Sequence, residues 1–205
     1  MDVSPISISE EVIQQFIYSV SKQVNARSQA RIISGLKSFF NYLVFEDYRI
    51  NNPLELIETP KIGRKLPDTL SLEEIDALIN AVDFSSNEGE RNRAMLETLY
   101  GCGLRVSELV SLKISDLFFE EGFVKITGKG NKQRFVPIGH LTQKYIQLYK
   151  ENVRSNVPVK KGFEDTLFLN RRGSQLTRAM IFTIIKDLAT KINLNKTISP
   201  HTLRH

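Results

Sequence analysis

Residues 122–138, "GFVKITGKGNKQRFVPI", interrupt the helical spacing of the chain and constrain its fold more than any other segment. Val124 and Ile126 are two apart, and Val136 and Ile138 repeat that spacing after a turn that contains glycine. Period-two spacing on both sides of such a turn predicts a β-hairpin. Because the other apolar patterns are mostly helical, we expect a mainly α fold with a small antiparallel β-sheet, of the α+β class.

Apolar residues with helical spacing run through much of the remaining chain. Near the start, Val12, Phe16 and Ile17 are expected to form one apolar stripe. Ser71 and Glu74 match a capping box ahead of another helical pattern. The predicted helices span 9–20, 28–45, 72–82, 92–100, 104–112, 141–149 and 180–192, with a short strand and turn at 167–177 and a helix start at 199–200.

A predicted linker divides the chain into parts of different charge. Residues 60–68, "PKIGRKLPD", combine two prolines and a glycine with charged residues. The part before it, 1–59, holds 5 basic and 7 acidic residues, whereas the part from residue 60 onward holds 23 basic and 16 acidic residues. A basic second domain, predicted over 69–205, favours a polyanionic partner such as nucleic acid. The alternative is a solvated basic surface.

Composition argues against several other classes of protein. The chain of 205 residues has a single cysteine, Cys102, so an internal disulfide is impossible and a reducing cytoplasm is the expected setting. One cysteine and three histidines give no zinc spacing, so we expect no metal. No apolar run approaches the length that spans a bilayer, and no secretory signal is visible, so we expect no membrane partner.

Arg105 and Glu108 form the first candidate pair for chemistry. Arg105 follows a glycine break and is predicted in the first turn of a helix, where the helix dipole disfavours a cation. A residue placed against its local preference often serves a contact elsewhere in the fold. Glu108 is three residues further on, on the same helix face, and can hold the guanidinium. The alternative is a surface ion pair.

The hairpin tip supplies the second set of candidates. Lys129, Lys132 and Arg134 lie in an acid-free stretch that suits a phosphate backbone. Lys129 stands on a glycine turn and can approach an anion closely enough to transfer a proton. The glycines do not form a Walker loop, because no Ser or Thr follows the lysine at the required spacing. The alternative is a charged tip that keeps the hairpin soluble.

The third set lies in "SPHTLRH", residues 199–205. His201 and Arg204 are expected to project from one face of a helix start, which suits an anion, although a capped helix with a polar first turn is the alternative. If the three sets meet, two arginines, a lysine and a histidine surround one anion. That arrangement fits phosphoryl transfer without a metal. The guanidiniums would neutralise non-bridging oxygens, the lysine would protonate a departing oxygen, and the histidine would position or deprotonate a nucleophile.

Four segments, in the same order and at similar separations, resemble the catalytic domain of tyrosine recombinases, nearest to the Xer type. They are "TLYGCGLRVSELVSLKISDL", "VKITGKGNKQRFVPIG", "LFLNRRGSQLTR" and "SPHTLRH". The resemblance covers most of residues 20–205. It implies a helical core-binding domain over 1–59 and a catalytic domain over 69–205. It also implies DNA breakage and rejoining through a 3′-phosphotyrosyl intermediate, with no ATP or other cofactor.

The resemblance implies roles for individual residues. Arg105 would be the first clamp arginine and Glu108 its acidic companion. Lys129 would be the general acid of the hairpin, and His201 and Arg204 would form the next catalytic pair. The predicted contacts to double-stranded DNA are Arg27, Arg31 and Lys37 in the core-binding domain, and Lys132, Arg134, Arg171, Arg172, Thr177 and Arg178 in the catalytic domain.

The chain departs from the family pattern at both ends. The family carries a further His or Trp and then the nucleophilic tyrosine beyond "HTLRH", and another helix ahead of "VSPISISEEVIQQF". We therefore expect a truncated chain that is catalytically incompetent and monomeric, from a parent that acts on DNA as a homo- or heterotetramer. The tyrosines present are interpreted as core or surface residues: Tyr18, Tyr42, Tyr48, Tyr100, Tyr145 and Tyr149.

The sequence thus predicts a site-specific DNA recombinase or integrase, with chromosome-dimer resolution, mobile-element integration and DNA inversion left open. One alternative is a non-catalytic DNA-binding protein in which the same clamp holds phosphate without chemistry. Another is a protein-interaction module with a basic face. Salt-dependent affinity for DNA separates this last alternative from the others, because phosphate binding releases counterions.

Overall fold

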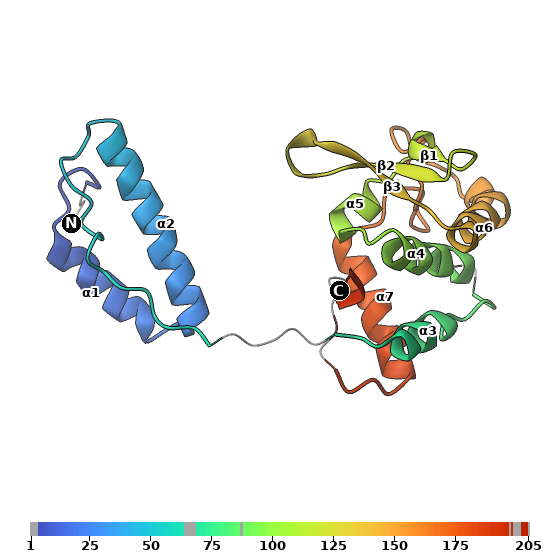
Figure 1. Ribbon diagram of the computed structural model, residues 1–205, viewed down its shortest axis with the longest axis horizontal. Coiled ribbons are helices and arrows are strands. Elements are labelled where there is room, and N and C mark those ends of the chain that lie inside the picture. Colours follow the sequence, from blue (N-terminus) through green and yellow to red (C-terminus); the bar gives the residue numbers. More distant parts are fainter. Residues whose placement is uncertain (1–3, 64–68, 87, 197, 199–201, 205) are drawn as a thin grey trace. The chain divides into compact units, whose positions relative to one another are not determined.

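The computed structural model describes residues 4–63, 69–86, 88–196, 198 and 202–204. The chain divides into two compact units, Met1–Leu66 and Pro67–His205, both drawn in Figure 1. The boundary between the units falls within residues 60–68, the segment predicted as a linker. Of the helices in the described ranges, none has the length and apolar character needed to cross a membrane.

The first unit is built on two helices, α1 (Glu10–Ser21) and α2 (Ala26–Phe45). Asn25 starts α2, because its side-chain oxygen accepts a 2.9 Å hydrogen bond from the backbone N–H of Ser28. Both helices begin and end within two residues of their predicted limits. Their small core consists of Ile13, Ile17, Ile33, Phe40, Leu43 and Leu54.

The predicted apolar stripe of α1 is wrong in part. Ile13 and Ile17 are buried against α2, whereas Val12 and Phe16 are 43% and 49% exposed. Each pair is four residues apart, so each forms its own row along the helix, and the two rows are adjacent. Helical spacing alone does not decide which of two adjacent apolar rows faces the neighbouring helix.

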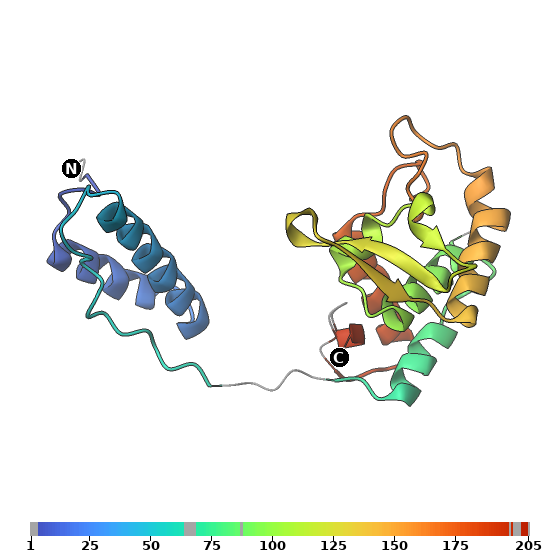
Figure 2. The same ribbon diagram turned by 45° about the horizontal axis from the view of Figure 1, so that its top comes forward.

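The second unit packs helices against one face of a small sheet, as Figures 1 and 2 show. The strands β1 (Leu117–Phe118), β2 (Phe123–Thr127) and β3 (Gln133–Pro137) are antiparallel, in that order across the sheet. The α-helices are α3 (Leu72–Asn80), α4 (Gly89–Gly101), α5 (Val106–Val110), α6 (His140–Leu148) and α7 (Arg178–Lys191). Short helical turns are η1 (Ile114–Asp116), η2 (Lys129–Asn131), η3 (Tyr149–Val153), η4 (Arg154–Asn156) and η5 (Thr202–Arg204).

Helix α4 is the centre of the second unit. Ala94, Met95, Leu96 and Leu99 along its length are fully buried, and a helix that is covered on all sides must be apolar on several faces. The sheet contributes Val124 and Ile126 to the same core, and α3, α5, α6 and α7 contribute further side chains. The two ends of α4 therefore hold fixed positions in the fold.

Several predicted elements are confirmed. The hairpin forms with Val124 opposite Val136, and the helices predicted between residues 72 and 192 are present with shifted ends. At α3 both halves of the capping box form: the Ser71 N–H donates to Glu74 at 2.7 Å, and the Glu74 N–H donates to Ser71 at 3.3 Å.

Other predictions are wrong. Residues 167–177 make a single bridge, between Leu169 and Gln175, in place of a strand. The reason is a tight turn in which the Asn170 N–H donates to the Ser174 carbonyl at 2.8 Å. These backbone groups are therefore paired within the turn and not with a neighbouring strand. Strand β1 was not predicted, since two residues are too short to display alternation. The helix start predicted at 199–200 lies outside the described residues.

Removing a methyl-rich side chain from α4 tests its central position. We expect Leu99→Ala to lower the free energy of unfolding by about 2–5 kcal/mol, because the neighbouring side chains can fill the cavity only in part. The matched control is Leu72→Ala on α3, whose side chain is 65% exposed and whose loss should cost less than about 1 kcal/mol. Urea unfolding followed by circular dichroism measures both. If both variants lower the free energy of unfolding equally, α4 is not the centre of the core.

Candidate functional site

The site is built around the start of α5. Gly103 adopts a left-handed conformation with φ of 56° and ends α4, and the Leu104 N–H closes the turn by donating to the Leu99 carbonyl at 3.1 Å. Arg105 then has extended backbone angles and is the N-cap of α5. The prediction that Arg105 occupies the first turn is therefore wrong by one position. The glycine reversal stops the helix immediately before it.

Glu108 caps the N-terminal end of α5, because its side chain reaches back to the N-cap residue Arg105. Its Oε2 accepts the backbone N–H of Arg105 at 2.8 Å, which is the acidic half of a capping box. Its Oε1 accepts Arg105 Nη1 at 3.0 Å. One carboxylate thus fixes both the backbone and the guanidinium of Arg105. The Arg105 side chain remains 50% exposed, so other N–H groups of its guanidinium face solvent.

Arg134 holds the same carboxylate from the opposite side. Its Nη1 donates to Glu108 Oε1 at 2.8 Å and its Nη2 donates to Oε2 at 2.9 Å, a bidentate pair. Arg134 is paired with Ile126 across the hairpin, and Ile126 is buried. The arginine therefore stands on the inner face of the sheet, which directs it toward α5. This ion pair ties the hairpin to the helix that carries Arg105.

Hydrogen bonds from two arginines keep Glu108 ionised although it is buried. Its side chain is 2% exposed, yet its pKa falls to about 2 because the hydrogen bonds from Arg134 outweigh the burial that opposes them, with the bonds from Arg105 adding to the effect. The same contact raises the pKa of the Arg134 guanidinium. The centre of the site is therefore a fixed anion between two fixed cations.

The hairpin places its lysines beside this centre. Gly128 runs so close to Glu108 that a Cβ atom there would lie 3.4 Å from Glu108 Oε1. Lys129 follows directly, in a turn where Gly130 and Asn131 both have positive φ, 72° and 59°. Lys129 and Lys132 are exposed, and neither forms an ion pair with any carboxylate in the described part of the chain. The structure thus brings Arg105, Glu108 and the Lys129 turn together.

The remaining predicted catalytic pair is described only in part. His201 lies outside the described residues. The backbone of Arg204 belongs to η5, whose Thr202 and Leu203 are buried. Leu203 belongs to the core cluster that α4 also enters, so η5 is anchored in the second unit.

The predicted DNA-contacting residues have varied surroundings. Arg171 is exposed but pairs with Glu88, and Thr177 accepts the Met180 N–H at 3.2 Å as the N-cap of α7. Lys37 is half-buried, and its Nζ donates to the Glu55 carbonyl at 3.3 Å. The others in the set have exposed side chains: Arg27, Arg31, Lys132, Arg172 and Arg178. Arg134 differs from all of these, since its guanidinium binds Glu108.

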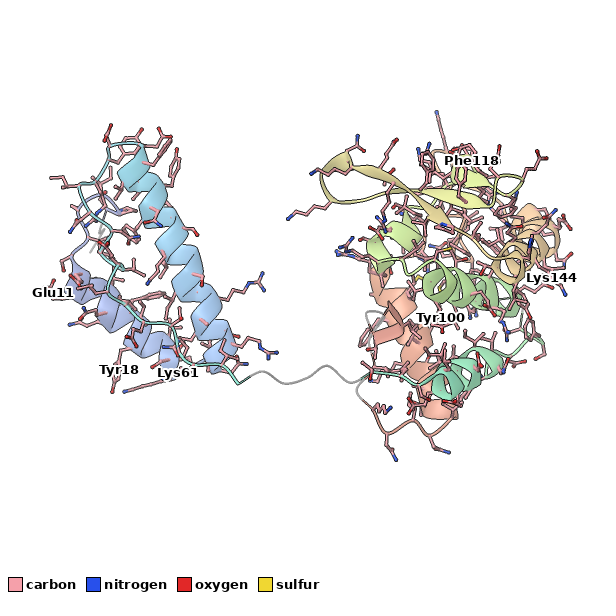
Figure 3. The ribbon with its side chains drawn as sticks, viewed as in Figure 1. Glu11, Tyr18, Lys61, Tyr100, Phe118 and Lys144 are labelled. Atoms are coloured by element: carbon pink, nitrogen blue, oxygen red, sulfur yellow. The ribbon has the colours of Figure 1, made fainter. Side chains whose placement is uncertain are left out.

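The tyrosines of the second unit belong to its core. Tyr149 is buried, and its hydroxyl accepts the Leu169 N–H at 3.1 Å. Tyr100 and Tyr145 pack against the main cluster, and Tyr145 also lies 4.7 Å from the Arg93 guanidinium (Figure 3 labels Tyr100). In the described residues, no tyrosine hydrogen-bonds to the three residues of the ion-paired centre.

Sequence reasoning missed the bridging role of Arg134, although a signal was present. Arg134, Val136 and Ile138 share parity along one strand, so the alternation that places the two apolar residues inward also places the arginine inward. An inward-facing cation requires a buried carboxylate partner. Which carboxylate it meets depends on how α5 packs against the sheet.

Comparison with known proteins identifies the family. The profile of the phage integrase family matches residues 68–205. The chain belongs to this family of tyrosine recombinases. The chain is 44% identical over 199 residues to the tyrosine recombinase XerD of Staphylococcus haemolyticus and 43% identical over 199 residues to that of Oceanobacillus iheyensis. Each match covers 97% of this chain and 67% of the relative, so the chain spans about two thirds of their length.

Solved structures of tyrosine recombinases share the fold. The XerH recombinase bound to a palindromic difH substrate, in a post-cleavage complex, superposes with a TM-score of 0.80 at 26% identity, over 98% of this chain and 61% of that one. The XerA recombinase gives a TM-score of 0.60 at 30% identity, over 100% and 69%. A lambda integrase dimer bound to a COC′ core site, at 18% identity and a TM-score of 0.74, over 100% and 73%, shares the fold alone.

Neutralising Glu108 tests the ion-paired centre. Because the folded-state pKa of about 2 lies below the ordinary value of 4.5, the ionised carboxylate stabilises the fold above pH 4.5 and loses this effect as the pH falls toward 2. We expect Glu108→Gln to lower the free energy of unfolding by about 2 kcal/mol at pH 7, through loss of charge-assisted hydrogen bonds. The deficit should shrink between pH 4.5 and 2 in urea unfolding curves.

The control for that experiment is Glu120→Gln, which removes an exposed carboxylate from the same unit. It should change the free energy of unfolding by less than about 0.5 kcal/mol at every pH. If the loss of unfolding free energy in Glu108→Gln stays constant from pH 5 to pH 2, the ionised carboxylate is not what stabilises the contact between α5 and the hairpin.

Proposed function

We propose that the chain is the DNA-binding and phosphate-clamping part of a site-specific recombinase that breaks and rejoins double-stranded DNA. The observation that carries the proposal is the Glu108 carboxylate, which holds Arg105 beside the lysine-bearing hairpin. A guanidinium held in place and still half exposed is suited to an oxygen that gains charge in a transition state. The relatives named tyrosine recombinase and the XerH complex with difH support the same assignment.

In the proposed reaction a tyrosine hydroxyl attacks phosphorus and the bond to the 5′ oxygen breaks, which leaves a 3′-phosphotyrosyl intermediate. Arg105 and Arg204 neutralise the non-bridging oxygens, and Glu108 acts by positioning Arg105. Lys129 gives a proton to the departing 5′ oxygen, and His201 positions or deprotonates the nucleophile. Rejoining reverses these transfers. The phosphotyrosyl bond conserves the energy of the phosphodiester, so no ATP is needed.

Positive side chains of both units are proposed to follow the DNA backbone. In the first unit, Arg27 and Arg31 are one turn apart on α2, and both are exposed. In the second unit the proposed contacts are Lys132, Arg172, Thr177 and Arg178, with Arg171 available when it leaves Glu88. The parent recombinase is proposed to act as a homo- or heterotetramer on two duplexes.

The salt dependence of DNA binding tests this proposal. Each phosphate-bound cation steepens the fall of log K with log[salt] by about one unit. We expect Arg31→Ala to weaken duplex binding and to lower that slope by about one unit. Lys22→Ala removes the same charge from the same unit, where Lys22 lies over the Tyr18 ring at 4.2 Å, and it should leave the slope unchanged. Binding that is indifferent to salt would contradict the proposal.

The tyrosines of this chain are not proposed as the nucleophile. Tyr149 is buried, Tyr100 and Tyr145 pack against the core, and the other three belong to the first unit. We therefore expect residues 1–205 to form no covalent adduct with nicked duplex substrates in which a cleaved strand is trapped. Denaturing gels with end-labelled DNA measure this. An adduct that mapped to any of the six tyrosines would overturn the assignment.

A further inference from the structure

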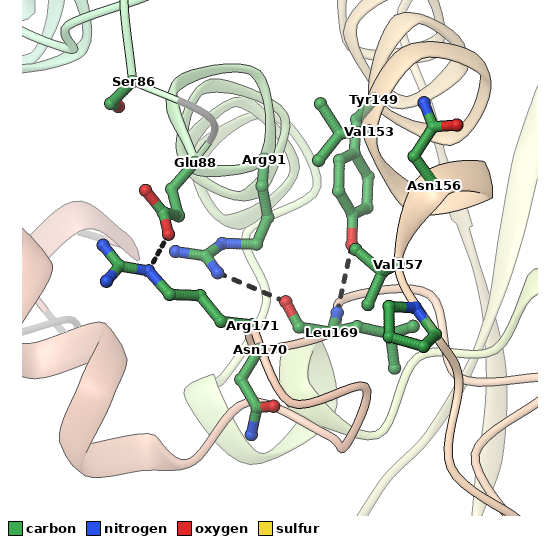
Figure 4. A pocket seen from close by; sticks show the side chains of 11 residues that line it. Ser86, Glu88, Arg91, Tyr149, Val153, Asn156, Val157, Leu169, Asn170 and Arg171 are labelled. Carbon is green, nitrogen blue, oxygen red and sulfur yellow. Dashed lines mark hydrogen bonds and ion pairs between the residues drawn. The ribbon is translucent and has the colours of Figure 1, made fainter.

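A cavity of about 660 Å³ opens at the N-terminal end of α4, and Figure 4 shows its lining. Its volume is within the range of small-ligand sites. A helix of 13 residues is about 20 Å long. This cavity and the turn that leads from Gly101 to Arg105 therefore lie at opposite ends of α4. The proposed phosphate clamp therefore does not account for it.

A buried arginine forms one wall of the cavity. Arg91 is 6% exposed. Its Nε and Nη2 donate to Asn92 Oδ1 at 3.2 and 2.9 Å, and its Nη1 donates to the Leu169 carbonyl at 3.3 Å. A guanidinium has five N–H donors, so two remain beyond these three bonds.

The charge of Arg91 has no ion-pair partner among the described carboxylates. Glu88, the carboxylate that shares the cavity, is engaged by Arg171 (Figure 4). The Glu88–Arg171 pair is neutral as a unit, which leaves the lining with one net positive charge. Burying an uncompensated charge is unfavourable, and burial is the main cause that lowers the pKa of Arg91. An anion in the cavity would offset that cost.

Tyr149 supplies a second donor next to the arginine. Its oxygen accepts the Leu169 N–H at 3.1 Å (Figure 4), which leaves the hydroxyl proton able to donate. Burial raises the pKa of Tyr149, so the phenol stays protonated at neutral pH. Val153, Val157 and Pro158 add apolar surface to the lining. The cavity thus combines two polar donors with an apolar wall.

We propose that this cavity binds a carboxylate carried on a small apolar group, with the carboxylate on Arg91 and Tyr149 and the apolar group against Val153 and Val157. A planar carboxylate matches the planar guanidinium. A single negative charge matches the single uncompensated positive charge, whereas a doubly charged phosphate would leave the cavity with a net negative charge. The same group occurs on a free organic acid and at the C-terminus of a peptide.

Titrating the chain while recording ¹⁵N-resolved amide spectra tests the proposal. The probes are isobutyrate and isobutyramide, and a tetrapeptide ending in leucine with a free or an amidated C-terminus. We expect the acids to shift the amide signals of Arg91, Tyr149 and Leu169, with affinities at least about 10-fold higher than those of the amides. Tighter binding of isobutyrate identifies a free acid as the source, and tighter binding of the peptide acid identifies a peptide terminus.

Three variants place the ligand in this cavity. Val157→Phe fills the apolar side without changing charge, and Arg91→Lys keeps the charge but loses the planar fork; each should weaken acid binding about 10-fold. Arg172→Ala is the matched control, because Arg172 lines only the neighbouring cavity of about 630 Å³, and its affinity should stay within about 2-fold. If Arg91→Lys fails to fold, Val157→Phe decides the question.

Three results would overturn the proposal. The first is equal binding of acids and amides, or binding of neither. The second is acid-dependent shifts at Arg105 and Arg134 in place of Arg91, which would put the carboxylate in the proposed phosphate clamp. The third is full affinity in the Val157→Phe variant. The first and third outcomes leave the proposed DNA contacts unaffected.

Discussion

The Glu108 carboxylate is the interaction on which the candidate site depends. It closes the end of α5, it holds the Arg105 guanidinium, and it accepts both ends of the Arg134 fork from the sheet. Two guanidiniums brought this close would repel each other without the anion between them. Because the hydrogen bonds from Arg134 and Arg105 keep that anion ionised despite its burial, the hairpin is held in place against α5. The turn that carries Lys129 directly follows Gly128 in this hairpin, so its position relative to Arg105 is set by the same contact.

Helix α4 gives the two ends of the second unit different chemistry. At its C-terminal end, Gly103 reverses the chain and exposes Arg105. At its N-terminal end, Arg91 is buried, and its guanidinium donates a hydrogen bond to the Leu169 carbonyl. Both arginines are positioned by one largely buried helix, Arg91 within α4 and Arg105 just after it. An exposed arginine suits a large anionic surface such as DNA, and a buried one suits a small group that enters a cavity.

Most helices and the hairpin were predictable because they depend on local spacing. The capping box of Ser71 and Glu74, the hairpin at 122–138 and the ends of α2 agree with the structure closely. Two of the failures share one cause, which is competition between local options. On α1 two adjacent apolar rows could each have been buried. At residues 167–177 a tight turn hydrogen-bonds backbone groups that the predicted strand would have used. The Arg105–Glu108 pair was predictable because its members are three positions apart in one helical turn.

The sequence by itself determined the fold class and the pairing of Arg105 with Glu108, because periodicity and short-range contacts act within a few residues. It also carried the motifs that resemble tyrosine recombinases. Only the tertiary structure decided that Arg134 completes the Glu108 centre across 26 residues and that Arg91 reaches Leu169 across 78. Such contacts depend on strand register and on how helices pack against the sheet. Those are properties of the whole core, and no local pattern encodes them.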